Sequence, residues 1–571
     1  MLIPLFLLWL AGECFAKIYE DVSELPGLEY DFVIVGAGAA GNVLANRLTE
    51  NLNFSVLVLE AGVSNEGVID SMVPLFVNNL LSGPNAYEWN YTTTPQVGLN
   101  NRSIPYQRAY ILGGCTSHNG MFYTRGSAED YNRWATLTGD SGWSWDDLLP
   151  YFFKNEKWSP PADNHDTSGE FNPAVHSTQG INSVSLSGSR WPIFENQVIQ
   201  TTRELPDEFP FNLDYNSGEP LGVGWFQSTI GNGTRSSSAT SYLAPQFIQR
   251  PNLHVLLHAQ VSKLVGPQTA KGVVSFEGVQ FSQGGSLFTA KATKETILSA
   301  GAIGTPAILM NSGIGDKNAL TALGISSVLD LPSVGQNATD QPTFFATWAY
   351  KNATLFNEAY AEWNATHTGP FTNLPVTHIA WTRLDADSPI FKNVTDPSAG
   401  PKTPHIEIFV GTGTGFGAAP TGNSMSFGMV MLTPTSRGSI TLQSNNPFDP
   451  PLIDPGMLVT DFDIFTARES VAQAYSFVQA PVWKDYIIAP TPDLSNMTTD
   501  ALDEFIRNNA YTSGHIVSTA AMSAKNAPYG VVNPDLLVKG ASGLSIIDAS
   551  IMAATYVVAE RGADLVKQRW T

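Results

Sequence analysis

The chain is poor in cysteine, with two among its 571 residues. Cys14 lies in an apolar N-terminal segment with the features of a cleaved signal, which would leave Cys115 as the one thiol of the processed chain. An internal disulfide framework is thereby excluded, so the hydrophobic core must stabilise the fold. At this length we expect two closely joined domains.

Long apolar runs are missing beyond the N-terminus. Residues 1–16, MLIPLFLLWLAGECFA, are too few to span a bilayer comfortably and end in small residues. This predicts a signal peptide and a secreted, extracellular protein, although the usual basic start is missing; a membrane anchor or buried helix is the alternative. Nine N-x-[ST] triplets suit a glycoprotein, at Asn53, Asn90, Asn101, Asn232, Asn337, Asn352, Asn364, Asn393 and Asn496.

Positive charge is scarce, since 30 Lys and Arg stand against 51 Asp and Glu, a net charge of -21. A field of this sign repels phosphate, so we expect neither nucleic acid nor a membrane surface as a partner. Apolar residues make up 43% and charged residues 14% of the chain, which favours a globular protein over a disordered one. We predict a monomer without a metal site.

A nucleotide-binding motif lies near the N-terminus. In YDFVIVGAGAAGNVLANRL, an apolar strand-like run leads through Gly36, Gly38 and Gly41 into a helical pattern. This G-x-G-x-x-G spacing permits a tight turn, close approach of a pyrophosphate, and packing of the helix on the strand. A second strand-like run, in SVLVLEAG, ends at Glu60, 24 residues after Gly36, where a carboxylate can bind a ribose. Together they predict a dinucleotide site.

Further segments identify a family. QRAYILGGCTSHNGMFYTRGSAEDYNRW (107–134), GAIGTPAILMNSGIG (301–315) and NPDLLVKGASGLSIIDASIM (533–552) resemble the glucose-methanol-choline (GMC) oxidoreductases, a family of flavoenzymes. The resemblance extends from Tyr30 to Leu565. Within the family the chain is most similar to fungal aryl-alcohol oxidases, on EWNYTTTPQ (88–96), PPADNHDTSGEFNPAVH (160–176), GNGTRSSSATSYL (231–243) and SNNPFDPPLIDP (444–455).

The resemblance implies an α/β fold, α+β overall. A Rossmann-like FAD-binding domain is expected in residues 28–150, 222–318 and 505–571, and a discontinuous substrate-binding domain on a large antiparallel sheet in 151–221 and 319–504. It implies FAD, with its adenosine near Gly36 to Glu60 and its ring near Gly114 to Asn119. The expected cofactor residues are Gly36, Gly38, Ala39, Ala40, Gly41, Glu60, Gly113, Gly114, Thr116, His118, Asn119, Gly120, Val261, Asp548 and Ala549.

Two of these residues have an alternative role, and two other segments depart from the family pattern. His118 falls where choline oxidases bond a histidine covalently to FAD, and a noncovalent contact is the alternative. Val261 matches a position whose backbone contacts adenine, although it also suits a plain strand core. Ala109-Tyr110 replaces the usual Gly-Arg, and Gln341 replaces the histidine of the G-x-N-L-x-D-H pattern.

Alcohol oxidation requires a base for the hydroxyl proton and an acceptor for the hydride, which in this family is flavin N5. His515, in NAYTSGHIVSTAAMS, matches the family's catalytic histidine, although Ile516 and Ser518 replace the Pro and Gly of its H-P-V-G-T pattern. Without the resemblance, a structural histidine would be the better interpretation. Tyr91 and Phe416 are expected at the substrate entrance, where aromatic rings select flat alcohols; packing between domains is the alternative.

The family's second catalytic residue, a histidine or an asparagine, has no counterpart. DASIM runs directly into AATYVVAERGADL, so the intervening loop is about nine residues shorter than in the family. Simple counting places Ala559 at that position, and neither residue type occurs after Asp548. Losing one of two cooperating groups costs orders of magnitude in rate, and the lost residues would also line the flavin.

The sequence therefore predicts a secreted FAD-dependent oxidase with a role in lignin degradation. It would convert aryl (benzylic or allylic) primary alcohols to aldehydes and reduce dioxygen to hydrogen peroxide. One alternative is a catalytically impaired or inactive FAD-binding homologue, and another is a printed sequence that omits a short coding segment. A dehydrogenase that passes electrons to quinones, or an oxidase of a sugar or aliphatic alcohol, is the third.

Overall fold

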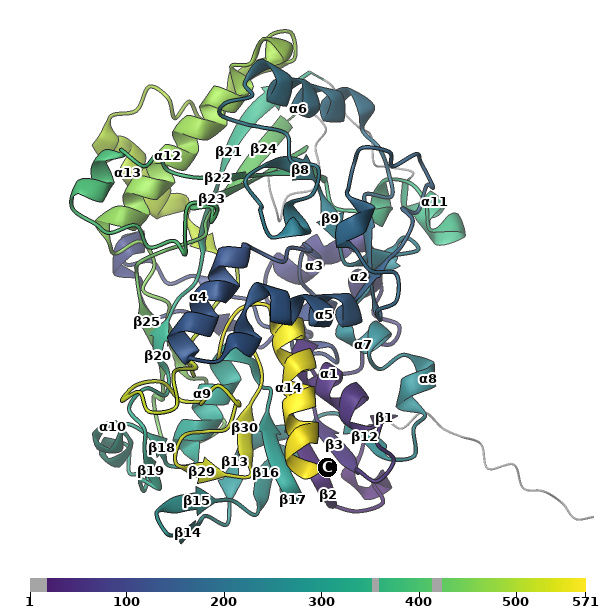
Figure 1. Ribbon diagram of the computed structural model, residues 1–571, viewed down its shortest axis with the longest axis vertical. Coiled ribbons are helices and arrows are strands. Elements are labelled where there is room, and N and C mark those ends of the chain that lie inside the picture. Colours follow the sequence, from purple (N-terminus) through teal and green to yellow (C-terminus); the bar gives the residue numbers. More distant parts are fainter. Residues whose placement is uncertain (1–17, 352–358, 413–423) are drawn as a thin grey trace, which may run out of the picture.

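The protein is built on two large sheets, one above the other in Figure 1. The computed structural model describes residues 18–351, 359–412 and 424–571. Helices and strands are both abundant, which confirms the predicted mixed α/β fold. The predicted signal peptide lies outside the described residues, and so does Phe416. Within the described ranges, no helix has the length and hydropathy needed to cross a bilayer.

The first sheet has eight strands in the order β1-β12-β3-β2-β17-β16-β13, with β30 beside β17. The strands around β2 run parallel and are buried on both faces, which explains their continuous apolar runs. Their bounds are β1 (Ile18–Tyr19), β12 (Leu253–Leu256), β3 (Val56–Leu59), β2 (Glu29–Val35), β17 (Ser286–Leu298), β16 (Gly278–Gln283), β13 (Gln260–Val265) and β30 (Leu544–Ile546). Three distant parts of the chain therefore share one sheet.

Two helices from opposite ends of the chain pack together on this sheet. Helix α1 (Ala39–Leu48) lies beside α14 (Thr555–Trp570), as Figure 1 shows. The Arg47 guanidinium binds the fully buried Glu560 carboxylate through Nε and Nη2, at 2.8 Å each. This two-pronged contact fixes the last helix against the first.

The second sheet is antiparallel and has seven strands in the order β27-β21-β24-β23-β22-β8, with β28 beside β21. Their bounds are β27 (Ile487–Pro490), β21 (Pro342–Tyr350), β24 (Ser424–Met431), β23 (Ile406–Thr412), β22 (Val376–Thr382), β8 (Gly222–Trp225) and β28 (Tyr511–Thr512). Helices α12 (Asp461–Val478) and α13 (Thr499–Asn509) lie beside it.

The chain crosses between the two sheets near the candidate site. β8 and β28 fall in ranges predicted for the FAD-binding domain, yet both pair with strands of the second sheet. β28 pairs with the start of β21, Pro342 opposite Thr512. Residues 513–520 then lead back toward the first sheet, where the Ala520 N–H donates to Ser550 O at 2.7 Å. His515 thus lies on the crossing segment.

Candidate active site

The N-terminal glycine motif forms a tight turn between β2 and α1. Gly36 has φ +97°, and a Cβ there would lie 2.5 Å from the Ser299 carbonyl oxygen. A Cβ on Gly41 would lie only 1.9 Å from the Gly36 carbonyl oxygen. Glycine at these two positions is therefore required for the strand-to-helix turn.

The second glycine segment lies against the first. Gly113 and Gly114 have φ +93° and +54°, and a Cβ on Gly114 would lie 2.8 Å from the Cα of Gly38. The Thr116 hydroxyl donates to the Gly113 carbonyl at 2.6 Å. Two backbone segments that are distant in sequence thus meet without intervening side chains.

Glu60 lies at the end of β3 and is buried. Its carboxylate accepts hydrogen bonds from the Ala37 and Gly62 N–H groups, both at 2.8 Å. Burial raises the pKa of Glu60, and these two bonds oppose the rise. The Ala259 N–H donates to the Glu60 carbonyl at 2.8 Å, which brings Val261 on β13 close to the same strand end. Val261 is itself buried and pairs with Phe281, so its strand-core interpretation also fits.

His118 and Asn119 follow the second glycine segment. His118 Nε2 is bound by the Glu88 carboxylate, and both side chains are buried. Asn119 Oδ1 accepts a hydrogen bond from Arg235 Nη1 at 2.9 Å. Gly120 comes next, and a Cβ there would lie 3.4 Å from the ring of Phe122. The side chains of His118 and Asn119 are thus both held by charged residues from other segments, Glu88 and Arg235.

Arg235 is a buried cation that the sequence did not single out. Burial lowers its pKa to about 9, and among the described residues no carboxylate pairs with it. Its Nε donates to the Ser71 carbonyl at 2.7 Å, whereas its buried Nη2 has no partner within the described part of the chain. Such an N–H group suits an acceptor on a bound molecule.

These features fit an extended dinucleotide. Helix α1 has no side-chain cap at Gly38, so Ala39, Ala40 and Gly41 begin the helix without competition for their N–H groups. A pyrophosphate would meet these groups and the positive end of the helix dipole.

Asp548 has a structural role at the end of β30. Its carboxylate accepts hydrogen bonds from the Gly301 N–H at 2.8 Å, the Thr305 hydroxyl at 2.6 Å and the Ser550 N–H at 2.8 Å. Burial raises its pKa, and these bonds oppose the rise. They join the strand end to helix α9 (Gly301–Asn311), and the half-buried Ala549 lies within the turn.

His515 has its ring fixed on one side and exposed on the other. Nδ1 lies 2.7 Å from Gln341 Oε1, and the backbone N–H donates to Asp340 Oδ1 at 2.9 Å. Burial lowers the pKa of His515; Asp340 opposes this and the Arg108 guanidinium adds to it. The residue is nevertheless exposed, so an edge of the ring is open to a small molecule. Nε2 is the nitrogen available to a substrate.

Arg108 links the other predicted residues to His515, and the sequence did not reveal it. It donates through Nη2 to the Gly514 carbonyl, and its Nη1 lies 3.6 Å from Cys115 Sγ. Tyr91 pairs with Tyr106, two residues before Arg108, and burial raises its pKa while the Arg108 charge opposes the rise. Tyr91 stacks on Trp89 at 5.6 Å and packs against the core. The Arg108 guanidinium therefore contacts both Cys115 and the residue before His515.

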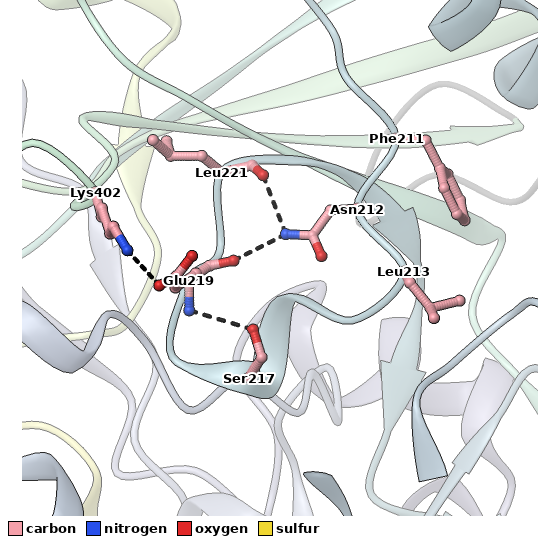
Figure 2. Close-up of a pocket in the computed structure, with 7 residues that line it drawn as sticks. All are labelled: Phe211, Asn212, Leu213, Ser217, Glu219, Leu221 and Lys402. Atoms are coloured by element: carbon pink, nitrogen blue, oxygen red, sulfur yellow. Dashed lines mark hydrogen bonds and ion pairs between the residues drawn. The ribbon is translucent and has the colours of Figure 1, made fainter. Parts of the chain in front are cut away.

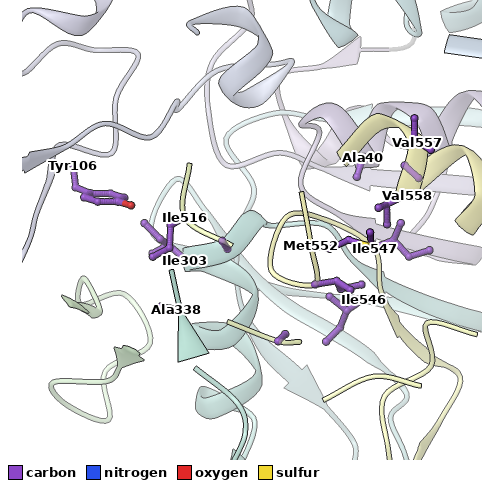
Figure 3. Packing of buried hydrophobic residues seen from close by; sticks show 14 of the residues in the cluster. Ala40, Tyr106, Ile303, Ala338, Ile516, Ile546, Ile547, Met552, Val557 and Val558 are labelled. Atoms are coloured by element: carbon purple, nitrogen blue, oxygen red, sulfur yellow. The ribbon is translucent and has the colours of Figure 1, made fainter. Parts of the chain in front are cut away.

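The shortened connection is closed by apolar packing. Met552 is buried, and Figure 3 shows it beside Ile546 and Ile547 with Val558 close by. Ala554 caps α14 with φ 63° and no side-chain hydrogen bond. Ala559 is fully buried within the helix. The position expected for the second catalytic residue thus holds an apolar side chain in the core.

Two cavities differ in their lining, and one of them has aromatic side chains near the crossing segment. A small one of about 20 Å³ includes Phe345 and Phe409 in its lining. Phe345 stacks on Tyr511 at 6.0 Å, four residues before His515. A larger cavity of about 340 Å³ (Figure 2) contains none of the predicted residues; it is lined by Phe211, Asn212, Leu213, Ser217, Glu219, Leu221 and Lys402.

Comparison with known proteins confirms the predicted family. Residues 30–343 and 434–559 match the GMC oxidoreductase family. Dehydrogenase eriK of Hericium erinaceus is 40% identical, over 98% of both chains. A pyranose dehydrogenase of Agaricus campestris is 42% identical, over 94% of this chain and 92% of its own.

Solved structures agree with this assignment. A variant of the formate oxidase of Aspergillus oryzae has a TM-score of 0.85 at 26% identity, over 95% of this chain and 99% of its own. A fungal aryl-alcohol oxidase has a TM-score of 0.80 at 25% identity, over 95% and 100%. The likeness to aryl-alcohol oxidases is thus weaker than that to the two dehydrogenases. The chain belongs to the GMC oxidoreductases, enzymes that bind FAD and act on CH–OH donors.

Proposed function

We propose that this protein oxidises the CH–OH group of a small alcohol with His515 as the base. The observation that carries this proposal is the bond from Nδ1 to Gln341, which leaves Nε2 for the substrate hydroxyl. Bound FAD would supply the hydride acceptor. His515 must be neutral to take a proton, and its lowered pKa favours the neutral form.

Aryl primary alcohols are the substrates that the local side chains favour, with dioxygen as the acceptor. The rings of Phe345 and Phe409 meet at 5.5 Å, and Phe345 adjoins the segment that carries His515. Tyr91 adds a third aromatic ring near Arg108. Such surfaces bind flat apolar rings by stacking and burial.

A sugar dehydrogenase with a quinone acceptor is the second candidate. It is favoured by the relatives of this chain that are named pyranose dehydrogenases, at 42% and 40% identity. Both candidates use the same base and cofactor, so the substrate and the acceptor are what distinguish them.

Anaerobic mixing of the purified, FAD-loaded protein with each substrate class tests the proposal. Bleaching of the flavin by a benzylic alcohol supports the first candidate, and bleaching by pyranoses alone supports the second. Reoxidation by dioxygen or by a quinone then identifies the acceptor. Failure of every alcohol and sugar to bleach the flavin would establish the impaired homologue, and sequencing the transcript across Met552 and Ala553 would show whether a coding segment is missing.

We also infer that the protein is secreted and glycosylated. All eight sequon asparagines in the described ranges are exposed, which suits glycan attachment. Recovery of the protein from culture medium, with a mass that falls on glycosidase treatment, is the expected result. Acid precipitation addresses the flavin linkage, since yellow protein indicates covalent attachment, for which His118 is the predicted residue, and yellow supernatant indicates noncovalent binding.

A further inference from the structure

Gln341 is bound at both ends of its side-chain amide. Gln341 directly precedes β21. Its Nε2 donates to the Leu432 carbonyl at 3.1 Å. Its Oε1 lies 2.7 Å from His515 Nδ1. The sequence marked this residue only as a departure from the family pattern.

The first contact fixes the orientation of the amide. A backbone carbonyl only accepts hydrogen bonds, so the NH₂ group must face Leu432. Oε1 therefore faces His515, and because this oxygen also only accepts, Nδ1 must carry the hydrogen. In the neutral ring Nε2 is then the unprotonated nitrogen.

One buried carboxylate holds the two residues in place. Asp340 Oδ1 accepts from the backbone N–H groups of His515 and Gln341, at 2.9 and 2.8 Å. Its Oδ2 accepts from the hydroxyls of Tyr106 and Thr512. Both partners are thus fixed through their backbones, so the distance between their side chains does not depend on a flexible loop.

We propose that Gln341 is a positioning residue that fixes the His515 tautomer so that Nε2 serves as the base. This inference rests on the proposed function and identifies the residue that sets the protonation of the catalytic base. The charged groups that face His515 are Asp340, which contacts its backbone, and Arg108, which contacts Gly514. A carboxylate at position 341 would stabilise the imidazolium, whereas the uncharged amide selects the tautomer without adding a charge that favours the cation.

Nitrogen NMR of the holoenzyme with ¹⁵N-labelled histidine tests the tautomer without any turnover. We expect a protonated Nδ1 and an unprotonated Nε2 for His515, assigned by the signal that disappears in His515→Asn. In Gln341→Leu this preference should be lost. A protonated Nε2 in the unaltered protein, or an unchanged tautomer in Gln341→Leu, would overturn the inference, whether or not the protein oxidises alcohols.

The pH dependence of flavin reduction gives a second readout. Gln341→Glu keeps the size of the side chain, so it carries the test if the leucine variant does not fold. Its carboxylate should raise the pH at which activity falls on the acid side by about one to three units. Gln336→Glu adds the same charge at an exposed position on β20 (Gln336–Ala338) and should leave the profile unchanged. Equal profiles for the two variants would contradict the assigned role.

Discussion

The cofactor end of the candidate site has the residues that its expected chemistry needs, whereas the catalytic end lacks one of two. At the cofactor end, Gly36, Gly41 and Gly114 each occupy a position where a Cβ would collide with backbone. At the catalytic end, His515 is held by Gln341, while the connection after Asp548 supplies neither a histidine nor an asparagine. The comparison teaches that the two ends can be tested separately, because the glycine contacts predicted to meet the pyrophosphate lie outside the shortened connection.

Replacing Gly41 by Val is expected to have the largest effect and would break the cofactor end. The added Cβ would lie 1.9 Å from the Gly36 carbonyl oxygen, so the turn must open, at a cost of about 3 kcal/mol or more, with loss of bound FAD. The ratio of flavin to protein absorbance measures occupancy. Gly27→Ala is the matched control, since a Cβ there meets nothing within 4 Å. Normal FAD content in the valine variant would show that the turn is not needed.

Replacing His515 by Asn tests the catalytic end alone. Removal of the base should slow flavin reduction by about 10² to 10⁴ fold while FAD content stays unchanged. Stopped-flow absorbance under anaerobic conditions measures the rate. His258→Asn serves as the control, because His258 is an exposed side chain that contacts Glu20 on the surface. An unaffected rate in the His515 variant would remove this residue from the mechanism.

Replacing Arg108 by Gln tests how the Arg108 charge affects the pKa of His515 at the catalytic end. Burial and Arg108 lower the pKa of His515, so the base stays neutral below the ordinary imidazole range. Without this positive charge the His515 pKa rises, and the acid-side fall of kcat/KM should move to higher pH by about one unit. Arg133→Gln is the control at an exposed site. A shift to lower pH would contradict the sign of this interaction.

Replacing Ala554 by Gly should produce the smallest effect, in the shortened connection itself. Ala554 has φ 63°, a left-handed conformation that costs non-glycine residues about 1 kcal/mol. Glycine should therefore raise the free energy of unfolding by about that amount, measured in urea. Ala553→Gly, one residue earlier and outside the left-handed region, should give no such gain. Equal stabilities would show that the connection is relaxed.

Local geometry could be predicted from the sequence, and long-range contacts could not. The turn at Gly36 to Gly41 and the strand end at Glu60 follow from spacing, because each requirement lies within one βαβ unit. Arg108 meets Gly514 across 406 residues, and Gln341 meets His515 across 174. These contacts depend on β28 pairing with β21, which no motif encodes. The same pairing places β28 in the second sheet, although its residues were expected in the FAD-binding domain.

The hydrogen bonds of Asp548 have an evolutionary consequence. They bind the chain after β30 to Gly301 and Thr305, and the Arg47 contact with Glu560 holds α14 in place separately. Neither anchor passes through the exposed Ala553, so loop length at this point is under little selection from folding. Descendants of one scaffold could gain or lose a second active-site side chain in a single insertion or deletion, and directed evolution could begin at the same position.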